Sequence, residues 1–256
     1  MRVIIIPSSV TRVETARQQF LSAYLLNGTV AIDAGSLGFY RTPKEQARVK
    51  HVFLSHSHMD HVASLPIFIE NSYLGDGNCA TIYGSEATLD SVRRDLFNDR
   101  VWPDMLRISQ IRPPYLRLQP IAAGQTVECD GLRVTPVPVD HVVPTFGYLV
   151  EEQGTTVVFS ADTGPTEALW DRANACADVK AAFLEVTFPN DMAWLADLAK
   201  HLTPEQFARE ARKLKHPARV VALHLSARVR HQVVKELRAL DLPNMEIVRL
   251  GKVYRF

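Results

Sequence analysis

The sequence of 256 residues is poor in cysteine and contains no long apolar run. Its three cysteines, Cys79, Cys129 and Cys176, are far apart and form no Cys-x-x-Cys pair, which argues against a disulfide framework or a structural zinc ribbon. We expect reduced thiols in the core. The apolar run at residues 3–6 is too short for the core of a signal peptide, and no later segment approaches the roughly 20 apolar residues of a membrane span. We therefore expect a cytoplasmic protein with no membrane partner.

A strong charge of either sign is also missing. The chain has 29 Lys and Arg against 28 Asp and Glu, a formal net charge of +1. A near-neutral balance gives no electrostatic reason to expect nucleic acid as a partner. There is no repeat of fixed period and no low-complexity linker. With 46% hydrophobic residues, a chain of this length can bury roughly 70 to 75% of its unfolded surface, so we expect a single domain over residues 1–256.

Apolar and β-branched runs alternate with helical patterns, which predicts an α/β protein. Strands are predicted at residues 3–6, 24–26, 29–33, 51–55, 81–84, 133–139, 145–150, 155–161, 181–185, 220–223 and 252–256. Helices are predicted at residues 43–49, 62–71, 85–97, 203–214 and 229–240. Asn27-Gly28 and residues 152–154 are typical of hairpin turns. Residues 98–123 contain four prolines and no sustained period, which predicts a long surface loop.

Four potential metal ligands lie within six residues, directly after the predicted strand at 51–55: His56, His58, Asp60 and His61. Neutral imidazole suits zinc and other first-row transition metals, and a carboxylate shifts the preference toward a harder, hydrolytic ion. Alternatively, Asp60 or Ser64 only caps a helix, but the three histidines would then need separate explanations. We interpret this loop, residues 55–61, as half of a two-metal site and call it the metal loop.

Further candidates follow other predicted strands. Asp162 and His224 come directly after the strands at 155–161 and 220–223, and His141 follows the strand at 133–139 after one residue. Ligand-bearing loops commonly lie at the carboxyl ends of strands in α/β proteins. Asp33 ends the strand at 29–33, where it could hydrogen-bond amides near the metal loop or simply form a turn.

Two residues outside this set have open roles. His201 lies just before the helix start Thr203-Pro204, and it is either a proton donor or a histidine that hydrogen-bonds Glu185 or caps the helix. Trp102, in the segment 98–123, could stack on a base or wall a pocket. It could equally be a local hydrophobic anchor or a subunit contact.

The order His-x-His-x-Asp-His, then a single His, an Asp and a final His, closely resembles the metallo-β-lactamase superfamily. The resemblance covers nearly the whole chain and implies a four-layer αββα sandwich. It implies two divalent metal ions, zinc with manganese or iron as alternatives. By the family pattern one metal takes His56, His58 and His141, the other takes Asp60, His61 and His224, and Asp162 bridges them.

Within that superfamily, the stretch from His58 to Pro66 is similar to the signature of the class II cyclic nucleotide phosphodiesterases. Residues 33–37, 97–104, 184–188 and 201–204 also match. Met59 replaces the usual leucine, and residues 223–226 lack a lysine often found after the last ligand. The resemblance implies hydrolysis of 3′,5′-cyclic AMP or GMP to the 5′-monophosphate by a metal-bridging hydroxide.

In that reaction Asp60 would orient the hydroxide and His201 would protonate the leaving oxygen. Trp102 and Asp33 would contact the substrate, a small cyclic nucleotide, and the protein could form a homodimer.

Three alternatives remain. A tRNA 3′-processing endoribonuclease is disfavoured by the near-neutral charge and the absence of a basic arm. A phosphonate-pathway cyclic phosphodiesterase is disfavoured by the missing cysteine-based zinc site. A non-catalytic metal-binding sensor module would tolerate the loss of a ligand, and none of the seven is lost.

Overall fold

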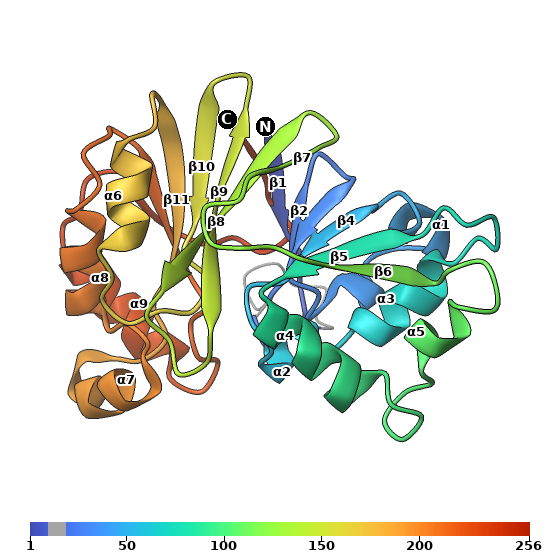
Figure 1. Ribbon diagram of the computed structural model, residues 1–256. Coiled ribbons are helices and arrows are strands. Elements are labelled where there is room, and N and C mark those ends of the chain that lie inside the picture. Colours follow the sequence, from blue (N-terminus) through green and yellow to red (C-terminus); the bar gives the residue numbers. More distant parts are fainter. Residues whose placement is uncertain (10–18) are drawn as a thin grey trace. The chain divides into compact units, whose positions relative to one another are not determined.

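The described chain forms two compact units, which we call unit 1 (residues 1–122 and 250–255) and unit 2 (residues 123–249 and Phe256). The computed structural model describes residues 1–9 and 19–256. Each unit is built on one mixed sheet of seven strands with helices beside it (Figure 1). Among the described residues, no helix combines the length and the apolar character needed to cross a membrane. The expectation of a single domain over residues 1–256 stays a prediction.

The sheet of unit 1 has the strand order β14-β1-β2-β3-β4-β5-β6. Its strands are β1 (Arg2–Ile5), β2 (Tyr24–Leu26), β3 (Val30–Ile32), β4 (His51–Phe53), β5 (Ala80–Gly84), β6 (Leu116–Pro120) and β14 (Val253–Arg255). Pairing is antiparallel from β14 to β3 and parallel from β3 to β6. Since parallel strands end at the same edge of a sheet, the loops after β3 and β4 lie next to each other.

The helices of unit 1 connect these strands. They are η2 (Leu37–Phe39), α1 (Pro43–Gln46), α2 (Met59–Val62), α3 (Leu65–Ser72), α4 (Glu86–Ser91), the π-helix η3 (Val92–Leu96) and α5 (Met105–Ile108). Leu65, Phe68 and Ile69 of α3 pack in one buried cluster with Val52 of β4 and Ile82 of β5. This apolar contact fixes the metal loop between a strand and the helices that follow it.

The sheet of unit 2 has the order β13-β12-β11-β10-β9-β8-β7. Its strands are β7 (Val127–Cys129), β8 (Leu132–Val139), β9 (Thr145–Glu152), β10 (Thr155–Phe159), β11 (Val179–Glu185), β12 (Arg219–Leu223) and β13 (Met245–Ile247). Pairing is antiparallel from β7 to β10 and parallel from β10 to β13. Strands β8, β10, β11 and β12 therefore all end at one edge, the edge that carries the candidate ligands of this unit.

The helices of unit 2 are α6 (Ala168–Asn174), η4 (Asn190–Met192), α7 (Ala193–Ala199), α8 (Pro204–Ala211) and α9 (Arg230–Ala239). Thr203 caps α8 in a capping box with Gln206, as its Thr-Pro start predicts. Trp170 of α6, Phe207 of α8 and Val233 of α9 belong to one buried cluster with the strands. These helices hold the loops at the ligand-bearing edge in place.

All eleven predicted strands are present, with ends that differ by at most two residues. The hairpin at Asn27-Gly28 is confirmed: both residues have positive φ, 50° and 88°, and they lie in the turn between Leu26 and Val30, which pair across β2 and β3. The predicted helix at 62–71 instead begins at Met59 and is interrupted after Val62. The interruption falls where Pro66 opens the first turn of α3, a position at which its missing N–H costs no hydrogen bond.

The prediction of a loop at residues 98–123 is wrong. The segment contains the short helix α5 and the edge strand β6, which pairs in parallel with β5. An edge strand can hold Pro120 because one side of its backbone needs no partner strand. Helices α6 and α7 and the short strands β7 and β13 were not predicted either.

Two of the three cysteines are core thiols as expected. Cys79 and Cys129 are buried, whereas Cys176 is half-buried, and all three are free. Burial raises the pKa of Cys129 to about 12, so this thiol stays protonated and unreactive at neutral pH.

Gly35 is a test of how tightly unit 1 packs under the metal loop. A Cβ at this position would lie 2.8 Å from the backbone N and O of Ser22 and would collide with the carbonyl oxygen of Asp60. We expect Gly35→Ala to lower the free energy of unfolding by about 2 to 3 kcal/mol, measured by chemical denaturation. Gly84→Ala is the matched control, because its Cβ would make only ordinary contacts, with the side chain of Leu89 at 3.4 Å and that of Thr88 at 3.5 Å. Equal stability of the two variants would contradict this packing.

Candidate metal centre

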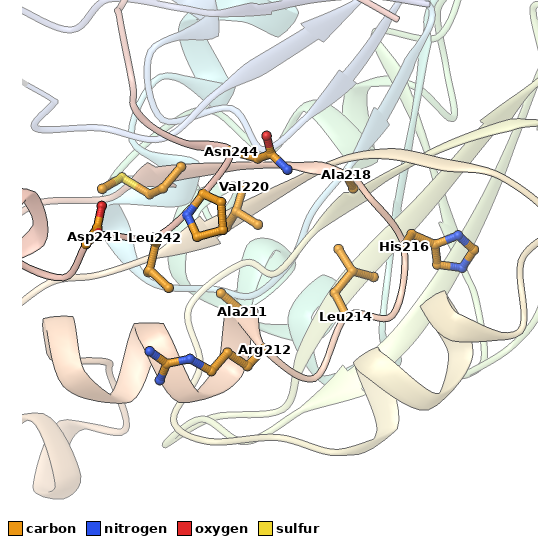
Figure 2. Close-up of a pocket in the computed structure, with 11 residues that line it drawn as sticks. Ala211, Arg212, Leu214, His216, Ala218, Val220, Asp241, Leu242 and Asn244 are labelled. Carbon is orange, nitrogen blue, oxygen red and sulfur yellow. The ribbon is translucent and has the colours of Figure 1, made fainter.

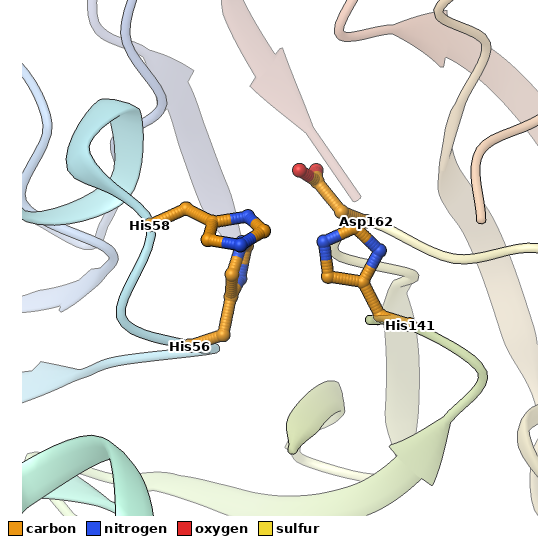
Figure 3. A group of neighbouring side chains, drawn as sticks. All are labelled: His56, His58, His141 and Asp162. Carbon is orange, nitrogen blue, oxygen red and sulfur yellow. The ribbon is translucent and has the colours of Figure 1, made fainter. Parts of the chain in front are cut away.

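The metal loop of unit 1 gathers its imidazoles closely. The ring centroid of His56 lies 4.6 Å from that of His58 and 4.1 Å from that of His61. His56 and His61 are buried, and the Nε2 atom of His61 lies 3.5 Å from a carboxylate oxygen of Asp60. Figure 3 shows His56 and His58 on the loop that follows β4. Unit 1 thus brings its predicted ligands together.

The alternative that this loop only caps a helix is wrong. The residue at the N-cap of α2 is His58, and its side chain makes no capping hydrogen bond. Ser64, at the N-cap of α3, makes none either. Its hydroxyl instead accepts a hydrogen bond from the amide of Gly38 and donates one to the carbonyl of Ala34.

Asp33 supports the metal loop through hydrogen bonds to two of its residues. Its side chain is buried; Oδ1 accepts a hydrogen bond from the Ser55 amide at 2.7 Å, and Oδ2 lies 2.9 Å from Ser55 Oγ and 2.7 Å from His61 Nδ1. The register explains this position, because Ile32 of β3 pairs with Phe53 of β4. The predicted hydrogen bond to a loop amide is confirmed. The predicted substrate contact is wrong, because the carboxylate is buried beneath the loop.

These hydrogen bonds fix the tautomers of two histidines. An ionised carboxylate can only accept, so His61 must carry its proton on Nδ1 to bond with Asp33. Ser55 Oγ donates its single proton to Asp33, and therefore it accepts from His56 Nδ1 at 2.9 Å. In both rings, Nε2 is then the nitrogen that keeps a lone pair for a metal.

Unit 2 places its three predicted ligands at one edge of its sheet. His141 and Asp162 follow β8 and β10, as Figure 3 shows, and His224 follows β12. The Nε2 atom of His224 lies 3.4 Å from Oδ1 of Asp162. His224 has a positive φ of 60°, as does Ala161, just before Asp162, at 54°. Non-glycine residues with such backbones concentrate at functional sites.

The same tautomer rule holds in unit 2. His141 Nδ1 lies 3.1 Å from the carbonyl oxygen of Lys200, which can only accept, so this nitrogen carries the proton. Thr187 Oγ1 donates to the carboxylate of Glu185 at 2.9 Å and therefore accepts from His224 Nδ1 at 3.0 Å. Again Nε2 is the nitrogen suited to a metal.

The residues of both units fit divalent metal ions. Imidazole nitrogens and carboxylate oxygens are the donors that zinc and neighbouring first-row metals take. Metal-ligating histidines in proteins almost always donate their other ring N–H to a carboxylate, carbonyl or other oxygen, which fixes the ring. Four of the five candidate histidines have such a partner at Nδ1: His56, His61, His141 and His224.

His201 occupies a different position. Its Nδ1 atom donates to the buried carboxylate of Glu185 at 2.7 Å, and its ring stacks on that of His224 at 5.6 Å. Burial alone would lower the pKa of His201, but the charge of Glu185 and this hydrogen bond raise it above the ordinary value. The cap of the following helix is Thr203, not His201.

Two further residues support the site. Glu185, the last residue of β11, is fully buried and accepts hydrogen bonds from the amides of Thr163 and Leu202 as well as from His201. Thr187 joins Glu185 to His224. The sequence indicates Glu185 only as an alternative partner of His201, through a charged residue at the end of an apolar strand, and it gives no sign of the role of Thr187.

Trp102 is half-buried and packs against the buried cluster of unit 1. Its indole N–H has no hydrogen-bond partner among the described residues. This packing favours the anchor interpretation over a stacking surface.

Unit 2 also contains a cavity of about 300 Å³ remote from the ligands (Figure 2). Leu214, His216 and Ala218, between α8 and β12, line one side, and Leu242 and Asn244 line the other. The cavity lies at the start of β12, whereas His224 follows the end of that strand. It contains no predicted site residue.

Comparison with known proteins identifies the family. A model described as the beta-lactamase superfamily domain matches residues 30–225. The chain belongs to this superfamily. This chain is similar in structure to the metallo-beta-lactamase fold protein YhfI from Bacillus subtilis. Its TM-score is 0.75 at 18% identity, with 99% of this chain and 98% of that chain covered. The predicted α/β class and metallo-β-lactamase fold are confirmed.

Two sequence relatives have names that state an activity. The superfamily member is 29% identical over 181 residues to a probable 3′,5′-cyclic-nucleotide phosphodiesterase from Yersinia pestis, covering 65% of this chain and 51% of that protein. It is 30% identical over 141 residues to a ribonuclease Z from Mycobacterium bovis, covering 52% and 50%. The chain thus spans about half the length of these curated relatives. The resemblance to cyclic nucleotide phosphodiesterases is confirmed.

Replacing Asp33 tests the support of the metal loop. An amide at this position loses the charge that holds the His61 Nδ1 proton, so we expect Asp33→Asn to weaken metal affinity by about 10- to 100-fold. Competition with a chromophoric chelator measures this. Asp90→Asn, which removes a carboxylate of the surface pair with Arg94, is the control. Unchanged affinity in Asp33→Asn would refute the role of this carboxylate.

The raised pKa of His201 predicts a pH-dependent stability in metal-free protein. A histidine whose folded pKa lies above its unfolded value stabilises fully below the unfolded value of 6.5 and loses that contribution as pH rises through the folded pKa. His201→Gln should therefore reduce the free energy of unfolding more at about pH 6 than at about pH 9. Denaturant titrations with a chelator present measure the difference. His231→Gln, at an exposed position of α9, is the control, and an equal loss at both pH values for His201→Gln would contradict the prediction.

Proposed function

We propose that this chain is a metal-dependent phosphodiesterase that hydrolyses 3′,5′-cyclic AMP or GMP to the 5′-monophosphate. The observation that carries the proposal is His201, a histidine outside the seven candidate ligands. It lies beside the ligand His224, and the buried carboxylate of Glu185 favours its protonated form. Phosphodiester cleavage needs such a proton donor, whereas thioester or lactam hydrolysis would leave this motif idle.

Seven residues would hold two divalent metals, zinc with manganese or iron as alternatives: His56, His58, Asp60, His61, His141, Asp162 and His224. When bound, such metals supply Lewis-acid activation of water and neutralise charge on the phosphate oxygens. Asp60 has a half-exposed carboxylate and a backbone carbonyl that accepts a hydrogen bond from the Ser22 amide at 2.8 Å. It would orient the attacking water, while its backbone is held by that bond.

His201 would supply the proton for the departing 3′ oxygen. Its Nδ1–H is committed to Glu185, so the proton available for transfer is on Nε2. An alkoxide is a strong base, and protonation by a positioned side chain is worth roughly 10²- to 10⁴-fold in rate. The ring also makes an edge contact with Phe188, with centroids 5.7 Å apart, which restricts its orientation.

The similarity to the Yersinia pestis protein supports a cyclic nucleotide as the substrate. Cleavage of RNA is a second candidate, because the Mycobacterium bovis relative is a ribonuclease Z. The formal net charge of +1 favours the smaller substrate, since a polyanion is best held by a strongly basic surface. Action as a homodimer in the cytoplasm is part of the proposal.

Turnover assays test the proposal directly. Protein with counted metal is incubated with cyclic AMP, cyclic GMP and a tRNA precursor in parallel, and the products are separated. We expect 5′-monophosphate, complete loss of turnover in Asp60→Ala, and a decrease of about 10²- to 10⁴-fold in His201→Asn. His231→Asn, on the exposed side of α9, should keep full activity.

Cleavage of the tRNA precursor alone would replace the cyclic nucleotide with RNA as substrate. No turnover of any of the three substrates by a fully metallated protein would reject the proposed phosphodiesterase.

A further inference from the structure

Three loops of unit 2 that carry candidate site residues meet at Asp140, Gly164 and Lys200, which we call the junction. Each of these residues lies one or two positions from a candidate site residue: His141, Asp162 and His201 respectively. The junction itself contributes no candidate ligand. It therefore belongs to the support of the site and not to its reacting groups.

Backbone and side-chain contacts join the three loops. The Gly164 amide donates to the carbonyl oxygen of Asp140 at 2.7 Å. The ammonium group of Lys200 pairs with a carboxylate oxygen of Asp140. The carbonyl of Lys200 accepts the Nδ1 proton of His141 at 3.1 Å. Lys200 thus holds His141 through its backbone and holds the residue before it through its side chain.

The backbone conformation of Lys200 is one that favours glycine over lysine. It lies at the C-cap of α7 with φ 54° and ψ 58°, the left-handed region. Glycine adopts that conformation without steric penalty and is the usual residue at the left-handed end of a helix. A lysine at this position is conformationally unfavourable, and its side chain makes an ion pair that glycine cannot make.

Because Gly164 has no side chain, Asp140 and Lys200 can lie close to its backbone. A Cβ at this position would lie 3.3 Å from Asp140 Oδ2, which is tighter than an ordinary contact, and 3.7 Å from Lys200 Cα. The small residue therefore lets the carboxylate of Asp140 approach the end of α7. Together, the contacts of these three residues hold the neighbouring loops in a fixed alignment.

We propose that Lys200 is a positioning residue for the metal ligand His141. Its carbonyl fixes the tautomer and direction of the imidazole, and its ion pair with Asp140 holds that carbonyl in line with the ring. The inference rests on the proposed function in one respect, that His141 binds a metal. Lys200 acts through His141 and touches neither substrate nor metal.

Lys200→Gly separates this role from general stability. It removes the ion pair and relieves the left-handed backbone, so we expect thermal stability to stay equal or to rise. Zinc affinity should nevertheless weaken up to about fivefold, the range of an exposed ion pair. Lys200→Arg should restore most of the affinity. Competition between purified chain and a chromophoric zinc chelator, at low salt, measures these dissociation constants.

Three further variants make the test specific. Asp140→Asn should weaken zinc binding as much as Lys200→Gly, and the double variant should be no weaker than either. Lys180→Met is the matched control, because it breaks the exposed pair of Lys180 with Asp178, 3.0 Å apart, at the other end of β11. It should leave zinc affinity unchanged.

The outcomes separate this inference from the proposed function. If the native chain binds two zinc ions and Lys200→Gly and Asp140→Asn bind them equally tightly, the positioning role is overturned while the proposed function stands. If the native chain binds none of zinc, manganese and iron, the proposed function fails and the inference fails with it. Should Lys200→Gly fold poorly, Asp140→Asn, which leaves the backbone unchanged, decides the question.

Discussion

The candidate metal centre depends on buried carboxylates that can only accept hydrogen bonds. Asp33 in unit 1 and Glu185 in unit 2 are both fully buried at the ligand-bearing edge of their sheets. Each receives a hydroxyl proton, from Ser55 and Thr187 respectively. Because those hydroxyls have no second proton to give, the neighbouring imidazoles must donate from Nδ1. The tautomers of the candidate ligand histidines are therefore determined by residues that do not themselves bind the metal.

Such carboxylates are stable only when their hydrogen bonds are complete. Moving an ionised carboxylate from water into the interior is unfavourable by several kcal/mol unless nearby donors offset the loss of hydration. Glu185 has four donors, from three segments of the chain: the amides of Thr163 and Leu202, the hydroxyl of Thr187 and the imidazole of His201. The loop of Asp162 and the turn before α8 are thereby tied to the end of β11. A fully connected network of this kind favours one arrangement of the site over others.

Much of the fold could be predicted from the sequence, and so could the grouping of the candidate ligands within each unit. The metal loop is visible because its four candidate ligands are close in the chain, and Asn27-Gly28 is visible because its turn is local. Supporting contacts are not visible in this way. Asp33 is 28 positions from His61, and Thr187 is 37 positions from His224, so only the register of the strands brings them together. The bond of Asp33 to a loop amide follows from its place at the end of a strand, whereas its bond to His61 does not.

The segment 98–123 shows a second limit of sequence patterns. Its prolines suggest a loop, yet β6 forms there because an edge strand needs hydrogen bonds on one side only. Trp102 lies in the same segment and is a stacking candidate by sequence. The structure instead packs it against the buried cluster of unit 1. Whether a tryptophan is an anchor or a binding surface depends on tertiary packing, which local composition does not determine.

The central expectation is that His56, His61, His141 and His224 present Nε2 to a metal. Nitrogen-15 NMR of histidine-labelled protein, recorded with and without added zinc, tests it most directly. His61 and His141 decide, because their Nδ1 partners, a carboxylate and a carbonyl, can only accept. We predict Nδ1–H tautomers for both before metal is added, and a zinc-dependent shift confined to Nε2. Protons on Nε2, or a shift at Nδ1, would contradict the account.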